Sequence, residues 1–251
     1  MARRPDPTTA LAAIWLGFLV FLTAWAVLEN PGLEYVANLV DTNFTRSITS
    51  ATLSTVITSL FSVILAVSLG LFLGLFAGSS PLWLQRTLEA LESIWTVFPP
   101  FLIALILVLA VGPSTIALVV AVSAVVWPPI SQAILEEVRK FRHSDLNAAA
   151  KIAGLRPRDV FWREVWPAVL PQLLSHAARC AATVTTLHFI LGFIQPTTLT
   201  NSWGAIIASD LTTPQPEAYW FAAPLLMFCL TLLSLARIRQ SLRRLSDPIL
   251  R

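Results

Sequence analysis

Charged residues and residues with catalytic or metal-binding chemistry are scarce in this 251-residue chain. Asp, Glu, Lys and Arg together make up 12% of it, and there are only three histidines and two cysteines. The histidines are scattered, and no His and Cys cluster has the spacing of a metal site. A phosphate-binding Gly-rich loop and a nucleophile motif are also absent. We therefore expect no metal site, no bound cofactor and no catalytic residue in the chain itself.

The two cysteines give no sign of a disulfide. Cys180 and Cys229 both fall within apolar stretches, where a structural disulfide would add little. We predict that both act as small apolar packing residues.

Apolar residues are abundant: 56% of the chain is hydrophobic, and its mean hydropathy is +0.72. A helix needs about 20 apolar residues to cross a hydrocarbon core of about 30 Å, because each residue rises about 1.5 Å. Six stretches fit this requirement: residues 10–28, 53–77, 94–111, 113–130, 173–194 and 219–236. The first is too long for a removed signal peptide and lacks a clear cleavage site. The sequence therefore predicts an all-α polytopic membrane protein with about six transmembrane helices, the third and fourth separated by a tight turn at Gly112-Pro113.

The basic residues predict the orientation of these spans. If the spans alternate in direction, most basic residues lie on one side of the membrane: Arg3, Arg4, Arg86, seven Lys and Arg residues between 131 and 171, and Arg237, Arg239, Arg243, Arg244 and Arg251. The other side receives Arg46 alone, together with several acidic residues. By the positive-inside rule the basic side, which carries both termini, is cytoplasmic. The formal charge of +3 therefore reflects topology and anionic membrane lipid, and we expect no nucleic-acid partner.

The longest polar segment, residues 131–171, holds seven of the 17 Lys and Arg residues and predicts two short helices. Ser144 is a suitable N-cap for the first helix, and Gly154 suits the left-handed conformation that ends one. Leu146, Ala149, Ala150 and Ala153 would share one small apolar face. Pro157 suits the start of the second helix, and Pro167 and Pro171 are expected to break it. From the residues alone, the segment is either an interfacial amphipathic linker or a docking surface for a soluble partner.

The same segment resembles the cytoplasmic loop of ABC-transporter permeases. That pattern is Glu-Ala-Ala, three residues, Gly, and later Leu-Pro; Ala149, Ala150, Gly154 and Leu170-Pro171 match it in register. The family glutamate falls on Ala148, so Asp145 or Asn147 would have to replace its contact. The resemblance implies a coupling helix that docks on a cytoplasmic ATPase. It assigns the ATPase contact to Asp145, Asn147, Ala148, Ala149, Ala150, Gly154, Arg158, Leu170 and Pro171.

Further clusters extend the resemblance to permeases of dipeptide, oligopeptide and nickel importers, above all their C-type subunit. They are Phe98-Pro99-Pro100-Phe101-Leu102, Val111-Gly112-Pro113-Ser114, Leu191-Gly192-Phe193, Ser202-Trp203-Gly204 and Leu245-Ser246-Asp247-Pro248. The resemblance implies a type I ABC importer permease: an N-terminal helix and periplasmic segment at 1–52, then a transmembrane domain at 53–251 with its coupling loop at 131–171. The stretch before the second span is shorter than usual in the family, so contacts with a binding protein would differ.

The resemblance also implies the assembly. Such a subunit pairs with a second homologous permease in the bacterial inner membrane and binds two cytoplasmic ATPases, which hold the ATP and Mg²⁺. A periplasmic or lipid-anchored protein delivers the substrate. Peptides, nickel complexes and opine-type metallophores all remain possible substrates.

Two alternatives lie outside the family. A stand-alone secondary transporter would need ionisable residues deep in several spans and inverted-repeat symmetry, and the sequence offers only Arg179 and His188 as such residues. An intramembrane enzyme would need paired catalytic groups at membrane depth, and the sequence shows none.

Candidate residues for the translocation path are Pro99, Pro100, Arg179, Thr183, Thr186 and His188. Helical spacing places His176, Arg179, Thr183 and Thr186 on one face. This face either lines the path or lets His176 and Arg179 snorkel to the interface. His188 either touches the substrate or is a hydrogen-bonded packing residue. Pro99-Pro100 forms either a kinked wall of the path or a helix start at the interface.

Overall fold

In the computed structural model, the described residues are 7–27, 42–112, 114–154, 156–196, 201–214 and 217–246. Their helices, in chain order, are α1 (Pro7–Val27), α3 (Thr42–Ser79), α4 (Leu82–Val97), α5 (Pro100–Val111), α6 (Thr115–Val126), α7 (Pro128–Arg142), α8 (Asp145–Ile152), α9 (Pro157–Val160), the π-turn η1 (Phe161–Val165), α10 (Trp166–Ile194), α11 (Trp203–Leu211) and α12 (Ala218–Ser246). No strand occurs in these ranges. The predicted all-α class is confirmed.

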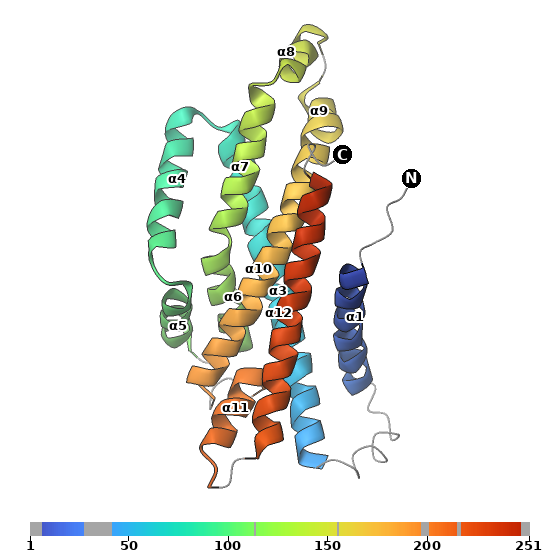
Figure 1. Ribbon diagram of the computed structural model, residues 1–251. Coiled ribbons are helices and arrows are strands. Elements are labelled where there is room, and N and C mark those ends of the chain that lie inside the picture. Colours follow the sequence, from blue (N-terminus) through green and yellow to red (C-terminus); the bar gives the residue numbers. More distant parts are fainter. Residues whose placement is uncertain are drawn as a thin grey trace.

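Three long helices form the centre of the bundle (Figure 1). Phe44–Ser79 of α3, Val169–Ile194 of α10 and Ala218–Arg243 of α12 are each long and apolar enough to cross a membrane. α10 packs against both α12 and α3, and α1 lies against α12 and α3. Two bent pairs, α4 with α5 and α6 with α7, raise the number of spans in the described residues from three to as many as five. The shorter apolar stretch Thr9–Leu19 lies in α1.

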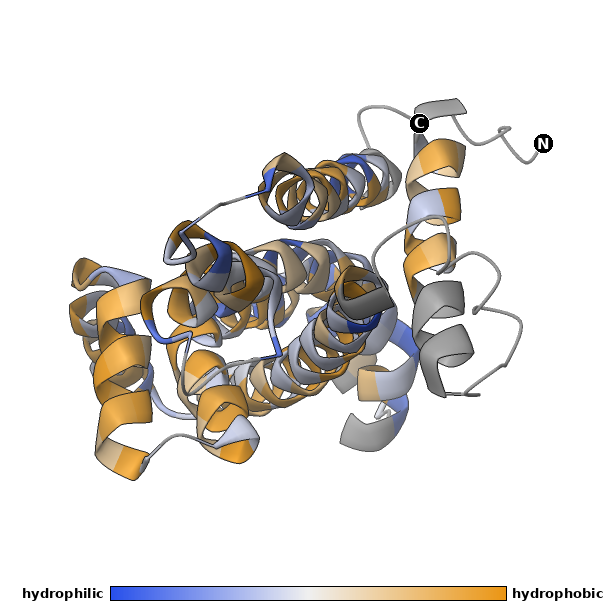
Figure 2. Cartoon of the chain, turned by 90° about the horizontal axis from the view of Figure 1, so that it is seen from below, coloured by the Kyte–Doolittle hydropathy of each residue, from blue (hydrophilic) through white to orange (hydrophobic). Residues whose placement is uncertain are grey.

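The predicted kink of the third span at Pro99-Pro100 is confirmed, but its predicted start at residue 94 is wrong, because the helix before the break begins at Leu82. α4 ends at Val97, α5 begins at Pro100, and the two axes differ by 91°. Phe98 and Pro99 are extended because a residue before proline is pushed out of the helical region. α5 consists wholly of apolar residues and lies across the bundle at its edge, at the left in the view from below (Figure 2).

The prediction that Pro167 and Pro171 break the second short helix is also wrong. α9 continues through η1 into α10 without interruption. Within η1 the turn is wider, so that the Trp166 N–H donates to the Phe161 carbonyl. Pro167 lies in the first turn of α10, where a missing N–H is tolerated, and Pro171 lies inside that helix.

A ladder of glycines sets the approach of α3 to α7. Gly70, Gly74 and Gly78 recur every fourth residue on α3 and face Ile130, Ile134 and Val138 of α7. A Cβ at Gly70 would lie 2.7 Å from the Ile130 Cβ, and one at Gly78 would lie 2.6 Å from Val138 Cγ1. Small residues at this spacing let two membrane helices bring their backbones close together. We call these three residues the glycine ladder.

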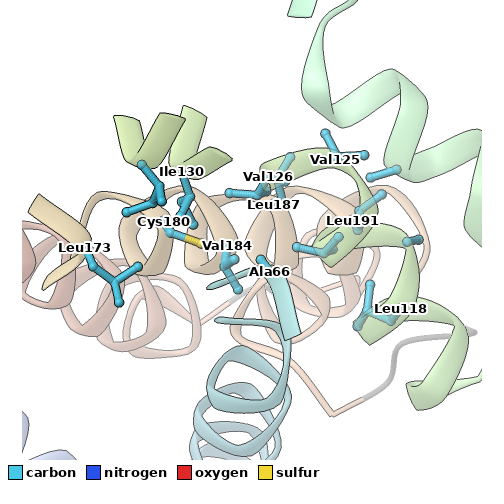
Figure 3. Close-up of a cluster of buried hydrophobic side chains, with 14 of the residues drawn as sticks. Ala66, Leu118, Val125, Val126, Ile130, Leu173, Cys180, Val184, Leu187 and Leu191 are labelled. Atoms are coloured by element: carbon cyan, nitrogen blue, oxygen red, sulfur yellow. The ribbon is translucent and has the colours of Figure 1, made fainter. Parts of the chain in front are cut away.

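The main hydrophobic core lies where α10 meets α3, α6 and α7 (Figure 3). Val184 and Leu187 of α10 lie beside Ala66 of α3 and Val126 of α6. Cys180 is buried in this cluster, so its predicted packing role is confirmed. Cys229 is exposed on α12, so the same prediction is wrong for that residue within this chain.

The two ends of the bundle carry different elements. α8 and α9 lie at one end with the C-terminal end of α12, whereas α11 and the first residues of α3 lie at the other (Figure 1). Residues 42–52 and α11 therefore share a side, as the charge pattern predicts; residues 28–41 lie outside the described ranges. Which end faces the cytoplasm stays a prediction.

Alkaline phosphatase fusions test that orientation. Because basic residues gather at the α8 end, we expect activity from fusions near residues 40 and 208, which would lie outside, and none from a fusion near residue 150. The reverse pattern would place the basic end outside and contradict the proposed topology.

Candidate functional site

A cavity of about 210 Å³ lies between α10 and the helices α4, α5, α6 and α7. Its lining combines five helices and the break between α4 and α5: Trp95, Thr96, Phe98, Pro100, Val125, Val126, Pro129, Ile130, His176, Arg179, Cys180 and Thr183. We call it the Arg179 cavity. His176 and Arg179 are the two lining residues that can carry a charge, and most of the other side chains are apolar.

The structure brings together three members of the polar stripe predicted on α10. His176, Arg179 and Thr183 all line the Arg179 cavity. The Thr183 hydroxyl donates to the Arg179 carbonyl at 3.2 Å. Thr186 is not part of the lining, and its hydroxyl donates to the Ala182 carbonyl at 2.9 Å.

The other predicted path residues are divided between the cavity and the rest of the bundle. Pro100 lines the cavity, whereas Pro99 is exposed at the bend just before it. His188 is not among the lining residues; it is 2% exposed, and its Nδ1 lies 2.9 Å from the Ser59 hydroxyl of α3. One ring nitrogen is therefore hydrogen-bonded within the bundle, whereas the buried Nε2 has no hydrogen-bond partner among the described residues.

Arg179 belongs to a group of basic side chains that make no ion pair with a described acidic residue. Arg179, Arg239 and Arg243 all lie within electrostatic range of His176, and Arg239 is also near Arg179 and Arg243. Within the described ranges, the ion pairs are Arg139 with Glu89 and Lys140 with Glu137. The guanidinium of Arg179 therefore makes no ion pair with a described carboxylate.

The wall of the cavity is linked to α7 through α4. Gln85 and Glu89 recur every fourth residue on α4, and both contact Arg139 of α7. The Arg139 Nε donates to the Gln85 Oε1 at 2.9 Å, and its guanidinium pairs with Glu89. Glu92, one turn further along, is buried with its carboxylate beside Ser131 and Gln132. α4 thus turns its polar face inward, so that a movement of α7 would pull on the cavity wall.

At the end of the bundle, α8 is joined to the last turn of α7 by its cap and by one side-chain hydrogen bond. The Ser144 hydroxyl accepts from the Asn147 N–H at 3.4 Å, which confirms the predicted cap. The Asn147 amide donates to the Arg142 carbonyl at 2.7 Å, and Arg142 donates to the Gly78 carbonyl of α3 at 2.6 Å. Gly154 has a φ of +66°, which confirms the predicted left-handed end of the helix.

α8 presents most of its surface outward. Leu146 is 61% exposed and Ile152 is 89% exposed. Asp145, Ala148 and Ala149 are exposed as well. Ala150 alone of the four residues on the predicted apolar face is buried, and it lines a second cavity of about 410 Å³ beneath the helix. The rest of that face, including Ala153, is therefore exposed.

The remaining predicted coupling residues lie apart from α8. Leu170 and Pro171 are in the first turns of α10, where Leu170 is 37% exposed and Pro171 is half-buried. The backbone of Arg158 belongs to α9, and its side chain lies outside the described part of the chain.

Two of the sequence clusters meet at the opposite end of the bundle. A Cβ on Gly192 would collide with the Ser202 side chain, and one on Gly204 would collide with the Phe189 carbonyl. α11 therefore begins directly against the last turns of α10. The indole of the buried Trp203 donates to the Thr52 hydroxyl of α3 at 3.0 Å, so α11 is also bound to α3.

Sequence reasoning missed the glycine ladder and the contacts of Arg139 with Gln85 and Glu89. The four-residue interval between Gly70, Gly74 and Gly78 is visible in the sequence and could have indicated a close helix contact. The contacts of Arg139 carried no local signal, because the partners lie about 50 residues away along the chain.

The described residues thus form a bundle with membrane-length helices, a short exposed helix at one end and an open cavity lined by His176 and Arg179. Residues 70–250 match the family described as binding-protein-dependent transport system inner membrane component. The chain therefore belongs to this family, whose members are membrane components of transport systems.

Several relatives are named as permeases. The chain is 30% identical over 169 residues to a "probable peptide ABC transporter permease protein" of Sinorhizobium fredii, covering 66% of this chain and 56% of the relative. It is 25% identical to the dipeptide transport system permease protein of Alkalihalophilus pseudofirmus, covering 68% and 57%. It is 22% identical to the oligopeptide transport system permease protein of Salmonella typhimurium, covering 66% and 54%. The matched regions span little more than half the length of these relatives.

Proposed function

We propose that this chain is the transmembrane permease subunit of an ATP-driven importer, with a translocation path for peptides or a related solute that includes the Arg179 cavity. The chain would couple to cytoplasmic ATPases through α8. The peptide assignment rests on the names of three relatives. ATP and Mg²⁺ would be held by the partner ATPases, so this chain would not hydrolyse ATP itself.

The observation that carries the proposal is the anchored and exposed α8. Its N-terminus is capped by Ser144, Asn147 bonds it to the last residue of α7, and that residue, Arg142, bonds α7 to α3. A helix held in this way can transmit a push, because its own contacts resist rearrangement. The exposed Leu146 and Ile152 supply the apolar surface that a protein partner would cover.

The contacts of Arg139 provide a route from α8 to the cavity. α7 leads directly into α8, and Arg139 joins α7 to α4 through Gln85 and Glu89. α4 carries Trp95 and Thr96 into the cavity lining. Closure of the ATPases would therefore move α8 and α7 and, through α4, reshape the Arg179 cavity.

The proposal includes an assembly. A second homologous permease would complete the path, two ATPases would bind on the cytoplasmic side, and a periplasmic or lipid-anchored protein would deliver the solute. The α8 end would face the cytoplasm of a bacterium, and both termini would lie on that side.

Charging the exposed face of α8 tests the docking role. We expect Leu146→Glu combined with Ile152→Glu to leave the amount of chain in the membrane unchanged, because both side chains are exposed. ATPase recovered on affinity purification of the complex should fall by about tenfold or more, since a charged side chain in an apolar interface is desolvated without a partner.

The matched control is Leu211→Glu, which charges a 54% exposed leucine of α11 at the other end of the bundle. It should leave ATPase recovery unchanged. Full ATPase recovery with the doubly charged α8 would show that the ATPase docks elsewhere.

A further inference from the structure

We propose that the Arg179 cavity binds an anionic group of the solute, namely a carboxylate such as the C-terminal carboxylate of a peptide. The inference rests on the proposed function, because it names the chemistry recognised within that path. Arg179 is the residue that would contact the carboxylate, and His176 and Thr183 flank it in the same lining.

The size of the cavity suits one end of a solute. Its volume of about 210 Å³ is below the roughly 300–1,000 Å³ of sites that enclose a whole small-molecule ligand. The walls offer Trp95, Phe98 and Val126 as apolar surface beside a single arginine. Such a site matches a terminal residue that has an apolar side chain and one charged group.

The charge of the cavity favours an anion. Arg179 makes no ion pair with a described carboxylate, and Arg239 and Arg243 add positive potential near His176. A guanidinium within an apolar span is stabilised by pairing or by contact with water. Its planar fork also matches the two oxygens of a carboxylate, which it can bind through two parallel hydrogen bonds.

A lipid headgroup could supply the same anionic chemistry through its phosphate. The position of Arg179 favours the solute. The cavity is open on the side where Phe98 and Arg179 are exposed. Its floor is formed by the buried Val126, Ile130 and Cys180 of α6, α7 and α10, so a group bound beside Arg179 would also contact the interior of the bundle. Pro100, at the bend between α4 and α5, forms part of the same wall.

Uptake of two matched peptides tests the proposal. The complete complex with its binding protein would be reconstituted in vesicles, and ATP-dependent uptake of a tripeptide and of its C-terminal amide would be measured with the binding protein saturated. In Arg179→Gln we expect uptake of the free acid to fall by roughly tenfold or more, as expected for the loss of a charge-assisted hydrogen bond. Uptake of the amide should change by less than about threefold, because a neutral amide loses little of such a contact.

Two further variants keep the test decisive if Arg179→Gln does not assemble. Thr183→Glu adds a negative charge to the same lining, so it should also reduce uptake of the acid more than uptake of the amide. Arg179→Lys keeps the charge and should retain part of the preference for the acid. The matched control is Arg46→Gln, which removes an exposed charge at the α11 end of the bundle, away from the cavity, and should leave the ratio of acid to amide uptake unchanged.

The outcomes separate the two proposals. If the wild-type complex transports neither peptide with ATP, the proposed function fails. If wild-type transport is normal but Arg179→Gln reduces acid and amide uptake equally, or reduces neither, the carboxylate site is overturned. Repeating the assay with and without phosphatidylglycerol addresses the lipid source: a defect of Arg179→Gln that appears only with this anionic lipid would assign Arg179 to a headgroup instead.

Discussion

Gly74→Ala, which adds a single methyl group, should sharply reduce the amount of folded protein in the membrane. In Gly74→Ala the new Cβ would lie 2.7 Å from the Ser131 carbonyl oxygen and 2.8 Å from the Ile134 Cβ. The nearest of these atoms, the Ser131 oxygen, belongs to the backbone of α7 and cannot rotate away as a side chain can. The helices α3 and α7 must therefore move apart. Overpacking of this kind costs about 1–3 kcal/mol, and sometimes more. We expect a lower melting temperature and a sharply lower yield of monodisperse protein by size-exclusion chromatography in detergent.

Other glycines of the chain provide matched controls. A Cβ at Gly17 of α1 meets no atom within 4 Å, so Gly17→Ala should leave yield and melting temperature unchanged. The three atoms nearest to a Cβ at Gly78 all belong to the Val138 side chain. Gly78→Ala should therefore be partly restored by Val138→Ala, which removes two of the three atoms in its way.

Gly74→Ala should not be restored by Ile134→Ala, because the Ser131 carbonyl remains in place. This difference separates a backbone obstacle from a side-chain obstacle. A Gly74→Ala protein with wild-type yield and melting temperature would show that α3 and α7 are further apart than the structure places them.

The glycine ladder also illustrates what the sequence could and could not predict. The spacing of the glycines, one at every fourth residue of an apolar stretch, predicts a close contact with another helix. It does not identify the partner helix, because many stretches of this chain are equally apolar. Only the structure shows that Ile130, Ile134 and Val138 of α7 fill that place.

Features governed by neighbours in the chain were predicted well. The cap at Ser144, the positive φ at Gly154 and the helix start at Pro157 all follow from local backbone chemistry, and each is found in the structure. The all-helical class followed from the long apolar stretches, which leave the chain few other ways to satisfy its backbone in lipid.

Features that depend on packing between distant segments were predicted less well. Hydropathy alone could not show that α4 and α5 meet at 91°, since apolar residues continue on both sides of Pro99. The spacing of prolines predicted a break at Pro171, but the π-turn at η1 and the packing of α10 keep that helix continuous. For His188, a single histidine in an apolar stretch did not show whether it faces a cavity or Ser59.

Changing Gly154 to valine should weaken ATPase binding and abolish transport-coupled ATP hydrolysis while leaving the chain in the membrane. Gly154 has a φ of +66°, and a Cβ there meets no atom within 4 Å. The substitution therefore strains only the local backbone, by about 1–2 kcal/mol for an ordinary residue in the left-handed region and more for a β-branched one. The strain lies at the end of α8, so we expect that helix to shift from the position set by Ser144 and Asn147.

The measurements are the membrane level of the chain, the ATPase recovered on affinity purification and the ATP hydrolysis stimulated by the loaded binding protein. In Gly154→Val the first should stay near wild type, and the second and third should be largely lost. Gly154→Asn should retain both, because asparagine tolerates the left-handed conformation. Gly112→Val provides a second control: Gly112 has a φ of +99° and equally open surroundings, but it lies between α5 and α6, away from α8. Its backbone strain should leave ATPase recovery intact. If Gly154→Val and Gly112→Val behave alike, with the ATPase stably bound and hydrolysis stimulated, α8 is not the coupling element and the proposed importer mechanism loses its structural basis.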